Sequence, residues 1–338
     1  MRKRILPKIL PAGAALALAW MAQAGLAGPA GTPAAGVAAQ GQGGGIRPHM
    51  LTYEVTLQHA LERSGIINAS GGLTSKLTGN ACEGWTSDSR MQVRFVFRRM
   101  GVRDTDTRVS GWESDDGNVY FSVLQRRLNG RLMETIQVRA RRARAGEPFV
   151  LEMAKPEKRR ETLPARTLFP TGGLKKILAA ARAGRRHLSL ALYEGDEELA
   201  PQHVVVTIGA KRSPLAAAAQ GAPAPRKGVE NGGAAGGKDG APGGGDDDLA
   251  LLARMAYWPV SMAYYGPLKV KAAAEKGGKR DEEALIKEEA RRRGVPDYEV
   301  SFRLYENGVT GDALLIYDDY TLRARVTGLK MLPARACE

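Results

Sequence analysis

The stretch YEVSFRLYENG, residues 298–308, indicates the fold most clearly because its apolar and polar side chains alternate. The even-numbered positions from Tyr298 to Leu304 are apolar, which is the two-residue period of a half-buried β-strand. Asn307-Gly308 then supplies the residues favoured in a type I′ turn, whose two central positions both have positive φ. Residues 314–317 return with apolar side chains. The sequence therefore predicts an antiparallel hairpin.

Similar alternation recurs in both halves of the chain, with turn-forming residues between the stretches. One such turn is Asp115-Asp116-Gly117-Asn118, where Gly117 suits positive φ. Short strands joined by turns of this kind predict an antiparallel meander. Besides residues 298–305, the expected strands are 53–57, 91–98, 119–124, 131–139, 149–154, 188–193, 204–208, 258–265, 314–317 and 320–326.

Residues 171–184 have a clear helical period amid these strands. Thr171 can cap the helix, Gly184 can end it, and the apolar residues from Leu174 to Ala181 fall on one side. A short helix with one apolar side needs a sheet to cover, so we expect it to close one end or face of the β structure. Residues 269–294 form a possible second, solvated helix. The predicted fold class is therefore all-β with one or two short helices.

The first 24 residues have the pattern of a cleavable secretory signal peptide. A basic start at residues 2–4 precedes an apolar run at 9–21, and Ala22-Gln23-Ala24 offers a cleavage site. The apolar run is well short of the roughly 20 residues that span a bilayer, and no cysteine near the cleavage site could carry a lipid. We expect export to the periplasm without a lipid anchor and without a transmembrane segment in the mature chain.

The net charge of +14 falls to +10 when the signal peptide is removed. A basic excess often indicates nucleic acid, and residues 139–144 carry four arginines. An exported protein rarely meets nucleic acid, however, and no aromatic platform interleaves with these arginines. We interpret the run as a solvated basic face, with weak attraction to an anionic envelope surface as the alternative.

Composition divides the rest of the chain into one folded domain and several flexible stretches. Residues 25–46 are rich in Gly, Ala and Pro and predict a disordered tether. Residues 211–248 and 269–294 are predicted flexible insertions in a single β domain at 47–338, because the strands on either side are too few to bury a core alone.

The chain has two cysteines, Cys82 and the penultimate residue Cys337. Because the N-terminus indicates an oxidising compartment, a disulfide between them is favoured over two unrelated thiols, one of them on a frayed tail. A bridge closing so long a loop would contribute about 5 kcal/mol in the chain-entropy model.

The residues that could support catalysis or metal binding are scattered. His49, His59, His187 and His203 lie in separate segments with no nucleophile motif beside them, and no pair of them has metal-ligand spacing. Paired aspartates in this chain fit turns. We therefore expect no enzyme activity, no metal and no cofactor.

The aromatic residues leave two interpretations open. They could fill the interior of a curled sheet, which is the favoured interpretation, or line a ligand cavity. The residues concerned are Trp85, Trp112, Trp258, Tyr264 and Tyr265.

Several short motifs follow one another in a definite order over residues 47–338. They are Arg47-Pro48-His49, 53–57, 79–85, Trp112-Glu113, 155–158, 168–171, Trp258-Pro259-Val260, 305–309 and Cys337. Their order resembles the EipB family of periplasmic cell-envelope integrity proteins. The resemblance implies a single antiparallel sheet curled into a spiral or open β-barrel, closed by a disulfide between Cys82 and Cys337, and it carries over no catalytic residue.

Three functions are compatible with these patterns. The resemblance favours a non-enzymatic scaffold for envelope integrity that binds a periplasmic envelope protein or a cell-wall component. A lipid or lipoprotein carrier is the main alternative, and it predicts an interior cavity of roughly 300–1,000 Å³ for acyl chains. An envelope hydrolase would instead require a histidine that meets both a carboxylate and a hydroxyl.

Overall fold

The computed structural model describes residues 45–213, 245–267, 294–334 and 337. The predicted signal peptide (1–24) lies outside the described residues. Nearly all of the predicted tether (25–46) and most of the predicted insertions at 211–248 and 269–294 also lie outside them.

The first half of the described chain is a meander of eight strands in sequence order. A 3₁₀ turn, η1 (Glu62–Ser64), separates the first two strands. The strands are β1 (His49–Ala60), β2 (Ile66–Asn80), β3 (Gly84–Phe97), β4 (Gly101–Glu113), β5 (Val119–Leu128), β6 (Arg131–Arg141), β7 (Phe149–Lys155) and β8 (Arg159–Leu163).

The second half adds two helices and six strands. The elements are α2 (Pro170–Arg182), β9 (His187–Leu192), β10 (Gln202–Ile208), α4 (Gly245–Arg254), β11 (Tyr257–Pro267), β12 (Tyr298–Tyr305), β13 (Thr310–Ile316) and β14 (Tyr320–Met331).

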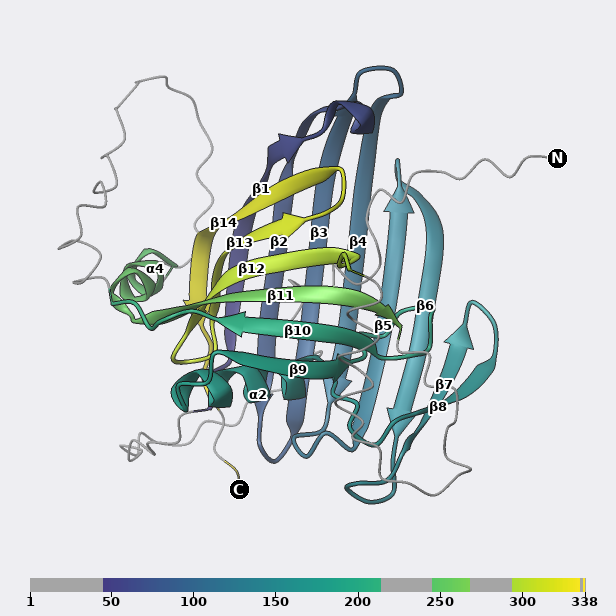
Figure 1. The fold of residues 1–338 in the computed structure, drawn as a ribbon, viewed down its shortest axis with the longest axis vertical. Coiled ribbons are helices and arrows are strands. Elements are labelled where there is room, and N and C mark those ends of the chain that lie inside the picture. The colour runs from purple at the N-terminus through teal and green to yellow at the C-terminus, as the bar shows by residue number, and fades with distance from the viewer. Residues whose placement is uncertain (1–44, 214–244, 268–293, 335–336, 338) are drawn as a thin grey trace, which may run out of the picture.

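All 14 of these strands belong to one antiparallel sheet, in the order β8-β7-β6-β5-β4-β3-β2-β1-β14-β13-β12-β11-β10-β9. The sheet curls so that β9–β14 pass in front of the longer strands β1–β5, and α2 lies at the lower edge (Figure 1). Its two edge strands, β8 and β9, do not pair with each other. The predicted all-β class and the open, curled sheet are confirmed.

The core lies between the two layers of the curled sheet. Apolar residues of β1–β3, α2 and β9–β14 form one buried cluster, and β4–β8 form a second with Phe169 and Tyr193. Phe95 of β3 meets Tyr320 of β14 edge to face, with ring centroids 5.7 Å apart. The hydroxyl of Tyr53 on β1 donates to the Thr310 carbonyl on β13 at 2.9 Å. The apolar positions of the 298–304 stretch are all buried, so its alternation marks an inward face, as predicted.

One of the two turns that the sequence suggested differs in type. Gly308 has φ of 81°, but Asn307 is not among the described residues with positive φ, so this turn is not type I′. The Gly308 N–H donates to the Tyr305 carbonyl, and Asn307 instead accepts the Val309 N–H on its side chain. Asn129-Gly130, between β5 and β6, does have positive φ at both residues. Gly117 has φ of 67°, as expected.

The ends of the predicted flexible stretches are ordered. Ile46 is buried, and the Arg47 N–H donates to the Asn307 carbonyl. Arg212 pairs with Tyr257, and Asp248 lies in α4, where its carboxylate accepts the Met331 N–H at 2.8 Å. The predicted tether (25–46) therefore ends too late, and the predicted insertion at 211–248 is too long at both ends. Backbone pairing and the Asp248 carboxylate order these residues, although their composition alone indicates flexibility.

Cys82 and Cys337 form a disulfide with a Cα–Cα distance of 5.8 Å. Cys82 lies in the β2–β3 turn, where the Asn80 side chain accepts the N–H groups of Cys82 and Glu83. Cys337 follows β14, which is separated from β2 only by β1. The bridge therefore links the β14-β1-β2 part of the sheet, away from the edge strands β8 and β9.

Helix α2 begins without the predicted Thr171 cap. Phe169 is its N-cap residue and makes no side-chain cap, and Pro170 occupies the first turn. The two carboxylate oxygens of buried Glu113, at the end of β4, accept the N–H groups of Thr171 and Gly172 at 2.8 Å each. A carboxylate here satisfies two orphan donors and complements the helix dipole. Glu113 therefore connects the first half of the sheet to α2.

We predict that replacing both cysteines with serine lowers the free energy of unfolding by up to about 5 kcal/mol under oxidising conditions. The loss comes from a larger unfolded-state entropy, so the circular dichroism spectrum of the native protein stays unchanged. Thermal unfolding with and without a reductant measures the effect. Equal melting temperatures for the wild type and the double variant would show that the disulfide is not a structural bond.

We also predict that Glu113→Gln costs about 1–3 kcal/mol of stability, because one carboxylate acceptor becomes an amide donor facing a backbone N–H. Urea unfolding of this variant against the wild type measures the cost, and Glu62→Gln on an exposed turn is the matched control. An E113Q variant as stable as E62Q would contradict the capping role.

Candidate functional site: a groove on the outer face of the sheet

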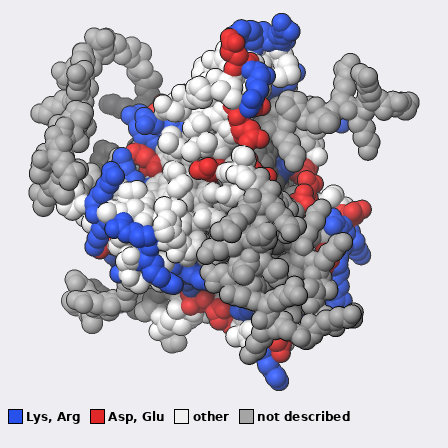
Figure 2. Space-filling model, viewed as in Figure 1, with Lys and Arg blue, Asp and Glu red and all other residues white. Residues whose placement is uncertain are grey.

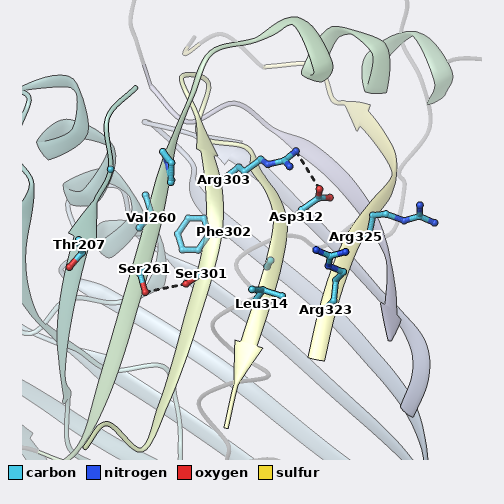
Figure 3. Close-up of a pocket in the computed structure, with 13 residues that line it drawn as sticks. Thr207, Val260, Ser261, Ser301, Phe302, Arg303, Asp312, Leu314, Arg323 and Arg325 are labelled. Carbon is cyan, nitrogen blue, oxygen red and sulfur yellow. Dashed lines mark hydrogen bonds and ion pairs between the residues drawn. The ribbon is translucent and has the colours of Figure 1, made fainter. Parts of the chain in front are cut away.

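A groove crosses the outer face of β10–β14, and its floor is one row of paired residues. Thr207 pairs with Ser261, Ser261 with Ser301, Ser301 with Leu314, and Leu314 with Arg323. These positions alternate with buried core residues, so their side chains point away from the core. We call this feature the arginine groove (Figure 3). Its volume is about 570 Å³.

Small hydroxyl side chains make the floor of the arginine groove shallow and supply hydrogen-bonding groups within a largely apolar lining. The hydroxyls of Ser261 and Ser301 are hydrogen-bonded at 3.1 Å (Figure 3). At one end of the floor Pro259 packs against Gly209. A Cβ added to Gly209 would lie 3.2 Å from the proline ring. Hydroxyl groups can donate and accept, so this floor suits a ligand that carries hydroxyl or carbonyl groups.

A second row beside the floor carries alternating charges. Arg303 pairs with Asp312 at 3.3 Å, and Arg325 pairs with Glu54 at 2.8 Å. These pairs are exposed and contribute little to stability. Arg323 forms no ion pair with any residue in the described part of the chain. Its guanidinium lies on the same side of the sheet as Leu314 and Asp312 (Figure 3). It is therefore the cation of the groove that a carboxylate or phosphate could bind.

Figure 2 shows uncharged side chains over much of the face formed by β9–β14, with Lys and Arg along its margin and Asp and Glu interspersed. The charge of this face is therefore mixed, and Arg323 is the cation that an acidic partner could pair with.

The five aromatic residues that the sequence singled out divide between the interior and the outer face. Trp85, Trp258 and Tyr264 are buried in the main core, as the favoured interpretation predicted. Tyr265 is partly buried and stacks on His203 with ring centroids 5.8 Å apart. Trp112 points the other way and lines a second outer groove.

The arginine run at 139–144 is only partly a solvated face. Arg142 lies 4.4 Å from the ring centre of Phe149 and donates to Asn118 and to the Ala165 carbonyl. Arg139, on the outer face of β6, is exposed. The prediction of a wholly solvated run is therefore wrong for Arg142.

The histidines do not assemble a catalytic centre within the described residues. His49 is buried and its Nδ1 contacts the Arg47 carbonyl at 2.6 Å. His187 lies 3.4 Å from the Thr207 hydroxyl. No histidine forms a hydrogen bond or ion pair with a carboxylate in the described chain. No group of three His, Cys, Asp or Glu residues that could hold a metal is found in the described ranges.

A buried acidic loop follows β9, and the sequence reasoning did not single it out. Asp196 is buried, and burial together with Glu198 and Glu197 raises its pKa to about 7. Burial likewise raises the pKa of Glu113 to about 7, although the two helix N–H groups and Lys175 act in the opposite direction. The sequence signal that could have identified this loop is the pair of acidic residues Glu194 and Asp196 on either side of Gly195.

None of the helices in the described part of the chain is long and apolar enough to cross a membrane.

These features define a class of protein: an open, curled antiparallel β-sheet with polar grooves on its outer face. The family model described as EipB-like matches residues 40–231 and 284–333, and the chain therefore belongs to the EipB-like family.

Two known proteins are similar to this chain. The cell envelope integrity protein EipB of Brucella abortus (strain 2308) is 24% identical over 298 residues, which are 87% of this chain and 88% of that protein. A crystal structure of a β-barrel-like protein of a domain of unknown function, also from Brucella abortus, has a TM-score of 0.65 and 22% identity. The match covers 86% of this chain and 99% of that one. It shows the shared fold.

We predict that Asp196→Asn stabilises the protein at pH 8 but not at pH 4. The folded-state pKa is about 7 against an ordinary 3.8, so the wild type loses stability as pH rises through this window. Asparagine has no charge to bury, and the gain at pH 8 is about 2–4 kcal/mol. Urea unfolding at both pH values measures it, with E62Q as control. A gain of equal size at pH 4 would contradict the titration of Asp196.

Proposed function

We propose that this protein is a non-enzymatic periplasmic protein that supports cell-envelope integrity by binding another envelope component on the outer face of its sheet. The observation that carries the proposal is the arginine groove, where a row of hydroxyls ends at Arg323. Such a floor offers binding and orientation. The Thr207 hydroxyl lies 3.4 Å from His187, but no carboxylate in the described part of the chain orients that histidine as a base. The name of the Brucella relative and the signal-like N-terminus agree with this location.

The component that fits is acidic. Arg323 supplies a charge-assisted donor, and Thr207, Ser261 and Ser301 supply hydrogen bonds along one line. The alternative of a carrier that holds acyl chains inside the curled sheet has less support, because Trp85, Trp258 and Tyr264 occupy the interior.

We predict that Arg323→Glu reduces complementation in a strain that lacks this gene. The measurement is survival on a membrane-perturbing detergent, with the variant expressed at wild-type level. A glutamate at this position repels an acidic partner, so the affinity for that partner falls about tenfold or more for a lost interaction of about 1.5–3 kcal/mol, and survival falls with it.

Arg99→Glu is the matched control, because Arg99 is an exposed arginine in the β3–β4 turn outside the groove. It should complement fully. Equal survival of the R323E and wild-type strains would overturn the role of the arginine groove.

A further inference from the structure

A second groove crosses the outer face of the other half of the sheet, from β4 to the edge strand β8. Its volume is about 710 Å³, within the range of small-ligand sites. We call it the tryptophan groove. Six of the residues that line it carry the argument: Trp112, Phe121, Gln137, Arg139, Glu152 and Arg160.

Five of these residues form one line across five strands. Trp112 pairs with Phe121, Phe121 with Arg139, Arg139 with Glu152, and Glu152 with Arg160. With strands about 4.8 Å apart, the line is roughly 19 Å long. Its β4 end is aromatic and its β8 end is charged, so a bound molecule would need a ring or apolar part followed by a charged part.

The β2–β3 turn fixes the orientation of Trp112. Its indole N–H donates to the Glu83 carbonyl at 3.2 Å. Its ring packs directly on Gly84, where an added Cβ would lie only 2.8 Å from the indole carbon Cζ2. The neighbouring Cys82 is tied to Cys337, so the turn itself is anchored. The indole, half-buried and fixed on one side, therefore presents a preorganised surface to the groove.

The charged end offers both donors and acceptors. Arg139 and Glu152 face each other across β6 and β7, yet neither forms an ion pair with another described residue. Arg160 adds a second guanidinium at the edge, and Gln137 adds an amide. Guanidinium groups bind a carboxylate, while a carboxylate and an amide oxygen accept hydrogen bonds from hydroxyls.

We propose that the tryptophan groove binds an acidic glycan, with a sugar ring against Trp112 and Phe121 and a carboxylate on Arg139 and Arg160. The aromatic faces of Trp112 and Phe121 are apolar with partial negative charge, which suits the C–H face of a pyranose ring. The hydroxyls of the glycan would donate to Glu152 and Gln137. An acyl chain in the same position would leave both groups desolvated without partners, which is costly. This site is separate from the arginine groove and extends the scaffold role to a defined ligand class.

The test is a calorimetric titration of the full mature protein with the disaccharide of N-acetylglucosamine and N-acetylmuramic acid. Di-N-acetylchitobiose is the neutral comparison, since it keeps the rings and lacks the carboxylate. We expect the acidic disaccharide to bind about tenfold more tightly than the neutral one, because one charge-assisted pair distinguishes them.

Trp112→Ala should weaken binding of the acidic disaccharide about tenfold or more, and Arg139→Ala should remove the preference over the neutral one. R139A alters only an exposed side chain, so it tests the site even if W112A fails to fold. Arg99→Ala, on the exposed β3–β4 turn outside both grooves, is the matched control and should bind as the wild type does. If the R323E prediction proved wrong in cells, these titrations would keep their meaning. The two experiments therefore test this proposal and the scaffold role separately.

Three results would overturn the proposal. One is no heat of binding for the disaccharide at millimolar concentration. Another is unchanged affinity in both W112A and R139A. The third is tighter, Trp112-dependent binding of monomeric dodecyl phosphate, which would assign the groove to an acyl-bearing anion instead.

Discussion

The pairing of β1 with β14 is the interaction on which the rest of the structure depends. It runs in antiparallel register from His49 with Met331 to Ala60 with Tyr320, and it joins the meander β1–β8 to the sheet β9–β14. Without it the two halves would be separate sheets, each with an apolar face open to water. With it, the sheet is continuous and can curl on itself, so that one core fills the space between the layers. The disulfide is placed beside this pairing, at the end where β1 begins and β14 ends.

Glu113 links this frame to the helix. One carboxylate accepts two N–H groups of α2 from the end of β4, and next to it Trp85 and Lys175 both contact Asp115. The aromatic ring of Trp85 lies under the Lys175 ammonium at 5.4 Å. Beside this network the β2–β3 turn holds Cys82 and supports Trp112. A structural anchor and a proposed binding surface therefore share the same end of the sheet, which gives the turn at residues 81–83 two roles at once.

Both grooves result from the same property of an antiparallel sheet. Alternate residues face the core, so the outward residues of neighbouring strands form rows across the sheet, and each row has a chemistry of its own. A row of small hydroxyls becomes a floor beside a taller charged row. A row that changes from aromatic to charged side chains offers an amphipathic line. Neither row could be recognised along the chain, because its members lie on different strands, eight or more residues apart, and come together only through strand register.

The sequence by itself determined the local features whose physics is local. Alternation gave the strands near residues 91–98 and 298–305, the helical period gave α2, and the export signal with two cysteines favoured the disulfide. It missed β2, whose run of Gly, Ser and Thr has little β character, and β4, where charged residues at 104, 106 and 108 interrupt the apolar pattern. It also missed the cap from Glu113 and the grooves that contain Arg323 and Trp112. Only the tertiary structure decided these, because a residue's partner across a sheet depends on strand order and register, and these are fixed by the packing of the whole core.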